Sequence, residues 1–136
     1  MLLVLDTNEY IFAFGFLKKP SAAALIDRIV DDFSTCTLRI SRMIVEEVRQ
    51  NLTPEEFQEF IAFIAALTDI DENFLVPFEI GARYELKGLK SPDAFIGAYT
   101  EWVGADILVT ENRHFLTLHA ELPFRILTAE SCLKLL

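Results

Sequence analysis

The fold is decided by residues 2–8, Leu-Leu-Val-Leu-Asp-Thr-Asn. Four consecutive apolar residues are typical of a strand that is buried on both faces, as strands of a parallel sheet are. Asp6 follows this strand directly, so we expect an acid at the carboxyl end of the strand. In open parallel sheets, functional sites form outside the carboxyl ends of the strands. Asp6 is therefore the first candidate for a site residue.

Predicted strands and helices alternate along the rest of the chain. Further strands are expected at residues 38–41, 74–77, 107–110 and 124–127, with 74–77 at an edge because Pro77 lacks a ladder donor. Apolar spacing and capping residues predict the helices between them, at 8–16, 22–33 with Ser21 as its N-cap, 43–52, onward from Pro54 with Thr53 as its N-cap, 80–86, Asp93 to Gly104, and 129–136. This alternation predicts an α/β fold, with three α/β/α layers around a central parallel sheet of about five strands.

The composition indicates one packed domain over residues 1–136. Hydrophobic residues make up 52% and charged residues 24%, and 12 phenylalanines are expected to supply much of the core. No apolar run approaches the roughly 18 residues of a membrane span, and the first run is too short for a signal peptide. We therefore expect a cytoplasmic protein, with its two cysteines, Cys36 and Cys132, reduced in or near the core.

Other acids can be placed relative to Asp6 by the same rule. Asp93 begins a predicted helix after a loop, and Glu111 and Asn112 follow strand 107–110 directly, so all three belong at the carboxyl edge. Asp106 precedes that strand. Four residues at about 3.3 Å each put Asp106 roughly 13 Å away, at the opposite edge, which excludes it as a partner of Asp6.

The helix after the second strand offers two acids, Glu46 and Glu47. Its apolar face is centred between Val48 and Leu52. Glu47 lies about 115° from that centre and Glu46 about 145°. The angles favour Glu47 by a small margin, so both residues stay open as site members.

Carboxylates gathered in one cleft point to a bound cation. At about 4 Å and an effective dielectric near 20, each pair repels by about 4 kcal/mol, which a proton or a metal must offset. Hard oxygen donors with no histidine nearby favour Mg²⁺ or Mn²⁺ over zinc. Such a metal activates water for attack on a phosphodiester. Taken singly, each acid could instead be a turn residue, a helix cap or part of a solvated face.

Four blocks of the sequence, in order, resemble those of PIN-domain proteins. They are Leu3 to Asn8, Ser41 to Val48, Leu89 to Ala98 and Gly104 to Phe115, and the end at Ile126-Leu127-Thr128 is similar too. The resemblance implies a five-stranded parallel sheet and metal-dependent cleavage of RNA. It puts Asp6, Glu47 and Asp93 in metal-binding positions, Asn112 in a fourth, usually acidic, catalytic position, and three residues in polar supporting positions: Thr7, Asn8 and Thr110.

The resemblance also implies partners. Stand-alone PIN proteins of this size resemble the VapC-type toxins of bacterial toxin–antitoxin pairs, which implies a ribonuclease silenced by a small protein antitoxin. Arg42, Lys90 and Arg113, with Lys87, flank the predicted site and are candidates for RNA contact. Part of the helical apolar surface could bind the antitoxin or a second copy, and we expect a homodimer.

Two other classes of function remain to be weighed. A PIN-like scaffold that binds a partner without cutting would suit the net charge of −9, which counts against a broad basic RNA-binding surface, and the neutral Asn112. A phosphatase of the haloacid-dehalogenase kind needs a second aspartate two residues after the first, where this chain has Asn8. A receiver domain needs an acidic pair at the first strand end, which is also missing here.

Overall fold

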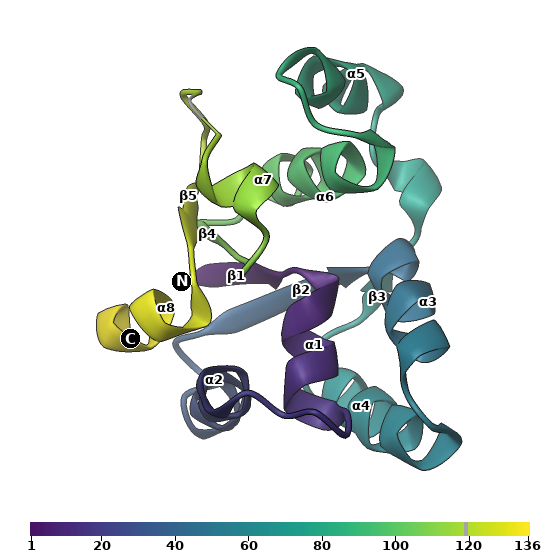
Figure 1. Cartoon of the computed structure of the whole chain (residues 1–136), viewed down its shortest axis with the longest axis vertical. Helices are drawn as coiled ribbons and strands as arrows, with labels where there is room; N and C mark the ends of the chain where they lie inside the picture. The colour runs from purple at the N-terminus through teal and green to yellow at the C-terminus, as the bar shows by residue number, and fades with distance from the viewer. Residues whose placement is uncertain (119) are drawn as a thin grey trace.

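The computed structural model describes residues 1–118 and 120–136 and is built on a five-stranded parallel sheet (Figure 1). The strand order is β3-β2-β1-β4-β5. The strands are β1 (Leu2–Leu5), β2 (Thr37–Ser41), β3 (Ile70–Asp71), β4 (Ile107–Val109) and β5 (Arg125–Leu127). Every pairing is parallel, which confirms the predicted sheet.

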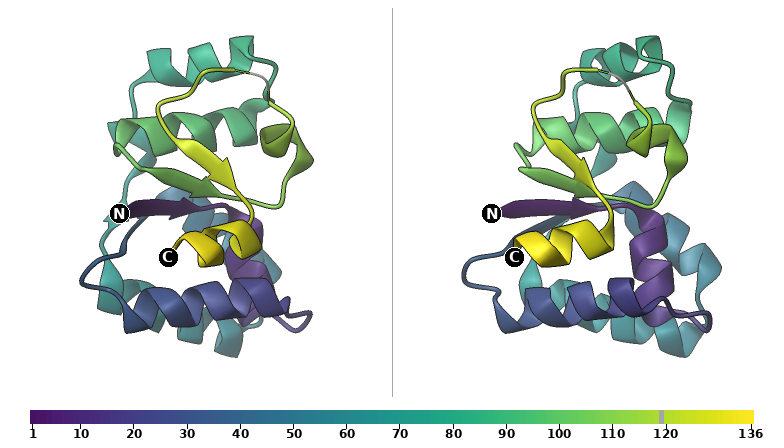
Figure 2. Two further views of the ribbon diagram at one scale, coloured as in Figure 1. Left: turned by 90° about the vertical axis from the view of Figure 1, so that its left-hand side faces the viewer. Right: turned by 60° about the vertical axis from the view of Figure 1, so that its left-hand side comes forward.

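Helices cover both faces of the sheet, so the predicted three layers are confirmed (Figures 1 and 2). One side carries α1 (Thr7–Phe14), α2 (Pro20–Asp31), α3 (Arg42–Asn51), α4 (Pro54–Leu67) and α8 (Ala129–Leu135). The other side carries α5 (Phe78–Leu86), α6 (Ser91–Trp102) and α7 (Arg113–Leu116), with α5 packed on the outside of α6. Within the described ranges, no helix combines the length and apolar character needed to cross a membrane.

The central strand β1 is the most deeply buried part of the chain. Leu3, Val4 and Leu5 have no exposed surface, because β2 and β4 pair with β1 on either side and helices cover both faces. Each such side chain contributes about 1.5–3 kcal/mol through its removal from water. The register sets Leu5 opposite Val109, so the residues that follow, Asp6 and Thr110, emerge side by side at one edge.

The predicted edge strand at residues 74–77 is wrong. The fifth strand is β3, whose Ile70 and Asp71 pair with Ile40 and Ser41. Residues Asn73–Leu75 form a 3-10 helix, and Phe74 is 83% exposed, so this apolar run does not enter the core. The Asp71 carboxylate helps to hold this strand beside β2, because it accepts hydrogen bonds from Arg39 at 2.9 and 3.0 Å.

Several helix ends differ from the prediction. The helix expected at 22–33 runs from Pro20 to Asp31 with Lys19 as its N-cap, because Pro20 suits the first helical position. The helix expected from Asp93 begins at Ser91, and the short helix α7 was not predicted. The cysteines are free and buried as expected. The phenylalanines contribute less core than expected, since four of them are exposed: Phe16, Phe33, Phe74 and Phe78.

Close packing of α5 on α6 depends on Gly97. A Cβ atom built at Gly97 would lie 2.6 Å from Cδ1 of the buried Tyr84 ring, a distance that requires one helix to move. Gly81 of α5 offers the matched case, because a Cβ there meets nothing within 4 Å. Both glycines lie in helices, but only Gly97 is in close contact with a neighbouring side chain.

We predict that Gly97→Ala lowers the free energy of unfolding by about 1–3 kcal/mol, through overpacking against Tyr84. Gly81→Ala should leave stability unchanged or raise it by up to about 1 kcal/mol, because alanine favours the helix. Urea unfolding of both variants measures this. Equal effects at the two positions would contradict the packing argument.

Candidate active site

Asp6 lies at the centre of the candidate site and is held by three hydrogen bonds. Its backbone N–H donates to the Val109 carbonyl at 2.8 Å, which continues the β1–β4 pairing by one residue. The Thr110 hydroxyl donates to Oδ2 at 2.7 Å, and the Thr7 backbone N–H donates to Oδ1 at 2.8 Å. Asp6 is only 6% exposed. Both carboxylate oxygens are thus oriented by the fold.

Asp93 and Asn112 extend this arrangement toward α6. Asp93 is in the first turn of α6, and its Oδ2 accepts a hydrogen bond from Asn112 Nδ2 at 3.3 Å. The Asn112 N–H donates to the Thr110 hydroxyl at 3.0 Å, and Asn112 Oδ1 caps α7 by accepting from His114 N–H at 2.9 Å. A chain of hydrogen bonds therefore connects Asp6 to Asp93 through Thr110 and Asn112.

Glu47 reaches the same place from α3. This helix begins directly after β2, with the Ser41 side chain as its N-cap, so its second turn lies close to the sheet edge. One carboxylate oxygen of Glu47, Oε1, is buried and has no hydrogen-bond partner among the described residues. Glu46 instead points outward and forms an ion pair with Arg49 at 2.6 Å. The structure therefore places Glu47 rather than Glu46 beside the aspartates.

The electrostatics show that these acids face one another. Burial raises the pKa of Asp6, and the charge of Asp93 adds to the rise, while the hydrogen bonds from Thr110 and Thr7 oppose it. Burial also raises the pKa of Glu47, and the charges of Asp6 and Asp93 raise it further. This edge of the sheet thus concentrates negative potential, which a proton or a cation would relieve.

The donor set fits a hard divalent cation in its chemistry. Asp6, Glu47 and Asp93 offer carboxylate oxygens from three separate elements, and the buried Oε1 of Glu47 has an unused lone pair. Within the part of the chain that the structure describes, no three acidic, histidine or cysteine side chains are gathered closely enough to form a ready metal site. The residues therefore match Mg²⁺ or Mn²⁺ in kind but are not spaced as finished ligands.

Comparison with solved structures identifies the fold. One similar structure is VapBC2 from Rickettsia felis bound to a DNA fragment from their promoter, with a TM-score of 0.63, 19% identity, and coverage of 93% of this chain and 97% of that chain. Another is FitAcB from Neisseria gonorrhoeae, with a TM-score of 0.62, 14% identity, and coverage of 94% and 98%. Both likenesses extend over nearly the whole of each chain.

The chain has a three-layer α/β/α fold that is PIN-like. Comparison of the sequence with protein-family models and with curated proteins found no match. The likeness is therefore one of structure, and it confirms the fold that the four sequence blocks implied.

The supporting positions of the PIN motif divide into two groups. Thr110 and Thr7 are buried at Asp6, Thr110 through its hydroxyl and Thr7 through its backbone. The Thr7 hydroxyl is buried without a hydrogen-bond partner in the described ranges. Asn8 is exposed at the start of α1. The threonines thus orient Asp6, whereas the structure gives Asn8 no such role.

The predicted RNA contacts also differ among themselves. Arg42 forms an ion pair with Glu72 at 2.9 Å, so its charge is partly neutralised. Lys90 and Arg113 are exposed at the starts of α6 and α7, and no ion pair joins either to a described acid. These two cations stand next in sequence to the elements that carry Asp93 and Asn112, which suits contact with a phosphate chain.

Glu9 is a buried acid that the sequence did not single out. It is 1% exposed, and neither carboxylate oxygen has a hydrogen-bond partner within the described residues. Burial raises the pKa of Glu9 to about 9, and the facing carboxyl of Glu111 and the charge of Asp6 add to the rise. Two ionised carboxylates cannot hydrogen-bond to each other, whereas a protonated Glu9 can donate to Glu111. The raised pKa and the facing carboxyl therefore predict that Glu9 keeps its proton at pH 7.

The burial of Glu9 cannot be predicted from its neighbours in sequence, because the residue that faces it, Glu111, is remote in the chain. The Glu111 carboxylate accepts a hydrogen bond from the Ala129 N–H at 3.1 Å, at the start of α8. Burial of Glu9 thus depends on the loop after β4 and on α8, both remote in sequence. An acid in the first turn of a helix otherwise indicates a solvated position that complements the helix dipole.

We predict that Glu9→Gln stabilises the protein increasingly as the pH rises. Unfolded Glu9 ionises near pH 4.5, whereas folded Glu9 keeps its proton up to about pH 9. The stability associated with neutral Glu9 is thus complete below pH 4.5 and is lost as the pH rises toward 9. The uncharged glutamine escapes this loss, which should amount to more than about 1 kcal/mol at pH 8.

Urea unfolding between pH 5 and 9 tests this prediction, with metal-free buffers throughout. Glu59→Gln, at an exposed position of α4, is the matched control and should show no trend with pH. A Glu9→Gln variant that tracks the wild type at every pH would mean that Glu9 is ionised in the folded protein.

Proposed function

We propose that this chain is a metal-dependent endoribonuclease and the toxin of a toxin–antitoxin pair. The observation that carries the proposal is the convergence of Asp6, Glu47 and Asp93 at the carboxyl edge of a PIN-fold sheet. The fold alone is compatible with other activities. Acids gathered at one sheet edge, two of which, Asp6 and Glu47, have raised pKa values, are characteristic of a site that works with a cation.

Asp6, Glu47 and Asp93 are the residues that would hold Mg²⁺ or Mn²⁺. When bound, such an ion supplies an activated water and stabilises the negative charge that develops on the phosphodiester. Thr110 and Thr7 fix the orientation of the Asp6 carboxylate by donating to its two oxygens. Asn112 steadies Asp93 without adding a negative charge. Ligand carboxylates supported in this way reorganise little when a cation arrives.

The RNA would be bound by local cations rather than by the overall charge, which is −9. Lys90 and Arg113 are the exposed cations nearest in sequence to Asp93 and Asn112. Phosphate contacts of this kind position a nucleic acid without reading its sequence. The target within tRNA, rRNA or mRNA is thus set by the shape of the RNA and by contacts beyond these two residues.

A protein antitoxin is the second partner that we propose. The support is that VapBC2 and FitAcB, which share the fold over nearly the whole chain, are both toxin–antitoxin complexes. A nuclease that cuts cellular RNA in the cytoplasm must be restrained while it is not needed. A non-cutting PIN-like scaffold is the alternative, favoured by the neutral Asn112 and by the absence of a ready metal cluster among the described residues.

We predict cleavage of a mixed RNA pool by the purified, partner-free protein in the presence of Mn²⁺. Asp93→Asn should lower the cleavage rate on the order of 100-fold or more, because it removes one charged oxygen donor from the cleft. Chelation should abolish cleavage. Cleavage that continues after chelation would contradict the metal mechanism. Hydrolysis of a small phosphate ester would indicate a phosphatase instead.

We also predict that Mg²⁺ raises the melting temperature. For a dissociation constant of about 1 mM, about 10 mM Mg²⁺ stabilises the folded state by about 1.4 kcal/mol, or a few degrees. Glu47→Gln should abolish the shift, because Glu47 faces the aspartates. Glu46→Gln, one residue away on the surface, should keep it. A scaffold with a degenerate site would show no shift in any of the three proteins.

A further inference from the structure

The loop between α1 and α2 exposes two large apolar side chains beside two lysines. Its sequence is Phe16-Leu17-Lys18-Lys19, and all four side chains are exposed. Phe16 is 92% exposed, more than any other large apolar residue of the described ranges, and Leu17 is 78% exposed. Apolar side chains gathered on the surface in this way indicate a place where another molecule binds.

The two lysines of the Phe16–Lys19 loop have no acidic partner within the described residues. Six of the 12 lysine and arginine side chains form ion pairs there, and neither Lys18 nor Lys19 is among them. Lys19 is nevertheless held in place. Its backbone N–H donates to the Phe12 carbonyl at 3.0 Å, and its Nζ lies 4.2 Å from the centroid of the Phe12 ring. The loop therefore presents positive charge that the fold itself does not use.

The Phe16–Lys19 loop lies on the same side of the molecule as the carboxylates. Both views in Figure 2 show the connection from α1 to α2 on the side toward which the strand arrows point, which is the carboxyl side of the sheet. Helix α1 begins directly after Asp6 and has 8 residues, so the loop is about 12 Å from the sheet edge. The charge of Lys19 opposes the rise in the pKa of Glu9, in the first turn of α1. The lysine is thus within electrostatic reach of the residues around the site.

Other cations without an ion pair in the described ranges extend this side. Lys90 and Arg113, at the starts of α6 and α7, are two of them. Arg125 is a third, but it lies at the opposite edge, where its N–H donates to the Asp106 carbonyl at 2.9 Å. The carboxyl side therefore carries cations on two flanks of the acids, at the Phe16–Lys19 loop and at the starts of α6 and α7.

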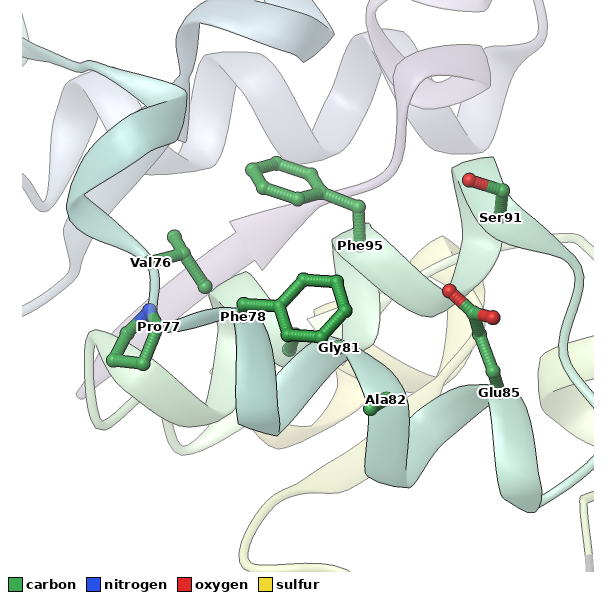
Figure 3. A pocket seen from close by; sticks show the side chains of 9 residues that line it. Val76, Pro77, Phe78, Gly81, Ala82, Glu85, Ser91 and Phe95 are labelled. Atoms are coloured by element: carbon green, nitrogen blue, oxygen red, sulfur yellow. The ribbon is translucent and has the colours of Figure 1, made fainter.

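Exposed rings elsewhere on the protein lack this combination. The hollow between α5 and α6 in Figure 3 has the exposed ring of Phe78, but its charged lining residue is the acid Glu85. Phe33, 66% exposed, follows the end of α2 on the amino side of the sheet, because it precedes β2. An exposed ring and two unpaired lysines thus coincide at the Phe16–Lys19 loop.

The occupant of this loop must offer negative charges together with flat apolar faces. An unpaired stretch of RNA offers both along one chain, because its phosphates are charged and its bases are free to stack on an aromatic ring. A paired duplex hides the faces of its bases. The combination of Phe16 with Lys18 and Lys19 therefore suits a single strand.

We propose that the Phe16–Lys19 loop binds an unpaired segment of the RNA that enters the carboxylate site, with a base stacked on Phe16 and phosphates at Lys18 and Lys19. This inference rests on the proposed function. Successive nucleotides of a stacked strand advance about 3.4 Å, so about four of them span the length of α1. The RNAs taken are those with single-stranded nucleotides about four positions from the phosphodiester at the carboxylates.

Binding of a labelled single-stranded RNA of about 12 nucleotides to the full chain tests the stacking, with chelator present so that no RNA is cut. Phe16→Ser should weaken binding about tenfold, the effect of losing one stacked base. Phe33→Ser, at an exposed ring on the amino side, is the matched control and should bind like the wild type. Equal affinities of the two variants would overturn the proposal. On a fully paired duplex Phe16→Ser should have no effect, and an equal loss there would contradict stacking.

The salt dependence of the same binding tests the lysines. Each phosphate contact with a single strand contributes about 0.7 to the slope of log affinity against log salt. The double variant Lys18→Gln with Lys19→Gln should therefore reduce the slope by about 1.4. Arg125→Gln, which removes an unpaired cation at the opposite edge, should leave the slope unchanged. Equal slopes in the double variant and the wild type would overturn the proposal.

Two further measurements address other occupants. Sedimentation with phosphatidylserine vesicles that is lost in Phe16→Ser would assign the loop to a membrane surface, and a dimer lost in this variant would assign it to a second copy. Either result would overturn the proposal. RNA that binds through the loop but is not cut when Mn²⁺ is added would refute the nuclease alone. RNA that is cut, but binds equally well without Phe16 and the lysines, would refute the loop site alone.

Discussion

The hydrogen bond from the Thr110 hydroxyl to Asp6 is the interaction on which the candidate site depends. It connects the ends of β1 and β4 and exists because Leu5 and Val109 are in register. Burial of a carboxylate is costly unless its oxygens are hydrogen-bonded. The Thr7 N–H satisfies the second oxygen. The two bonds allow a nearly buried acid to stay at the carboxyl edge of the sheet, near Glu47 and Asp93.

The remaining acids reach Asp6 because other chain segments turn at the same sheet edge. Helix α3 begins where β2 ends, with Ser41 as its cap, and this brings its second turn and Glu47 over the edge. Helix α6 follows α5, which packs on its outer side, and carries Asp93 in its first turn. Burial raises the pKa of Glu47 and of Asp6, and repulsion by the neighbouring acids adds to the rise, so the ionised site carries an electrostatic cost that a bound cation would reduce.

Sequence reasoning succeeded where local order determines position. A residue that directly follows a buried parallel strand must lie at its carboxyl end, which placed Asp6 and Asn112 correctly at one edge. The same rule excluded Asp106, whose carboxylate accepts a hydrogen bond from the Leu2 N–H at the other edge. The helical angle favoured Glu47 over Glu46, and the structure turns Glu46 to Arg49 on the surface.

The failures concern features that depend on distant partners. Strand β3 was misplaced because apolar content favours residues 74–77, whereas pairing with β2 and the bonds of Asp71 to Arg39 and Tyr99 select residues 70–71. Glu9 was missed because its burial depends on Glu111 and α8. Neither effect is visible within a window of neighbouring residues, since each joins segments separated by 28 to 102 positions.

The net charge of −9 has different consequences near the carboxylates and around α5. Near the carboxylates, Arg42 is held by Glu72, which leaves Lys90 and Arg113 as the cations open to a phosphate chain. Around α5, the exposed rings of Phe74 and Phe78 lie near the acids Glu79 and Glu85. The field of so acidic a chain would repel RNA from most of the molecule and would attract a basic protein partner, such as the proposed antitoxin.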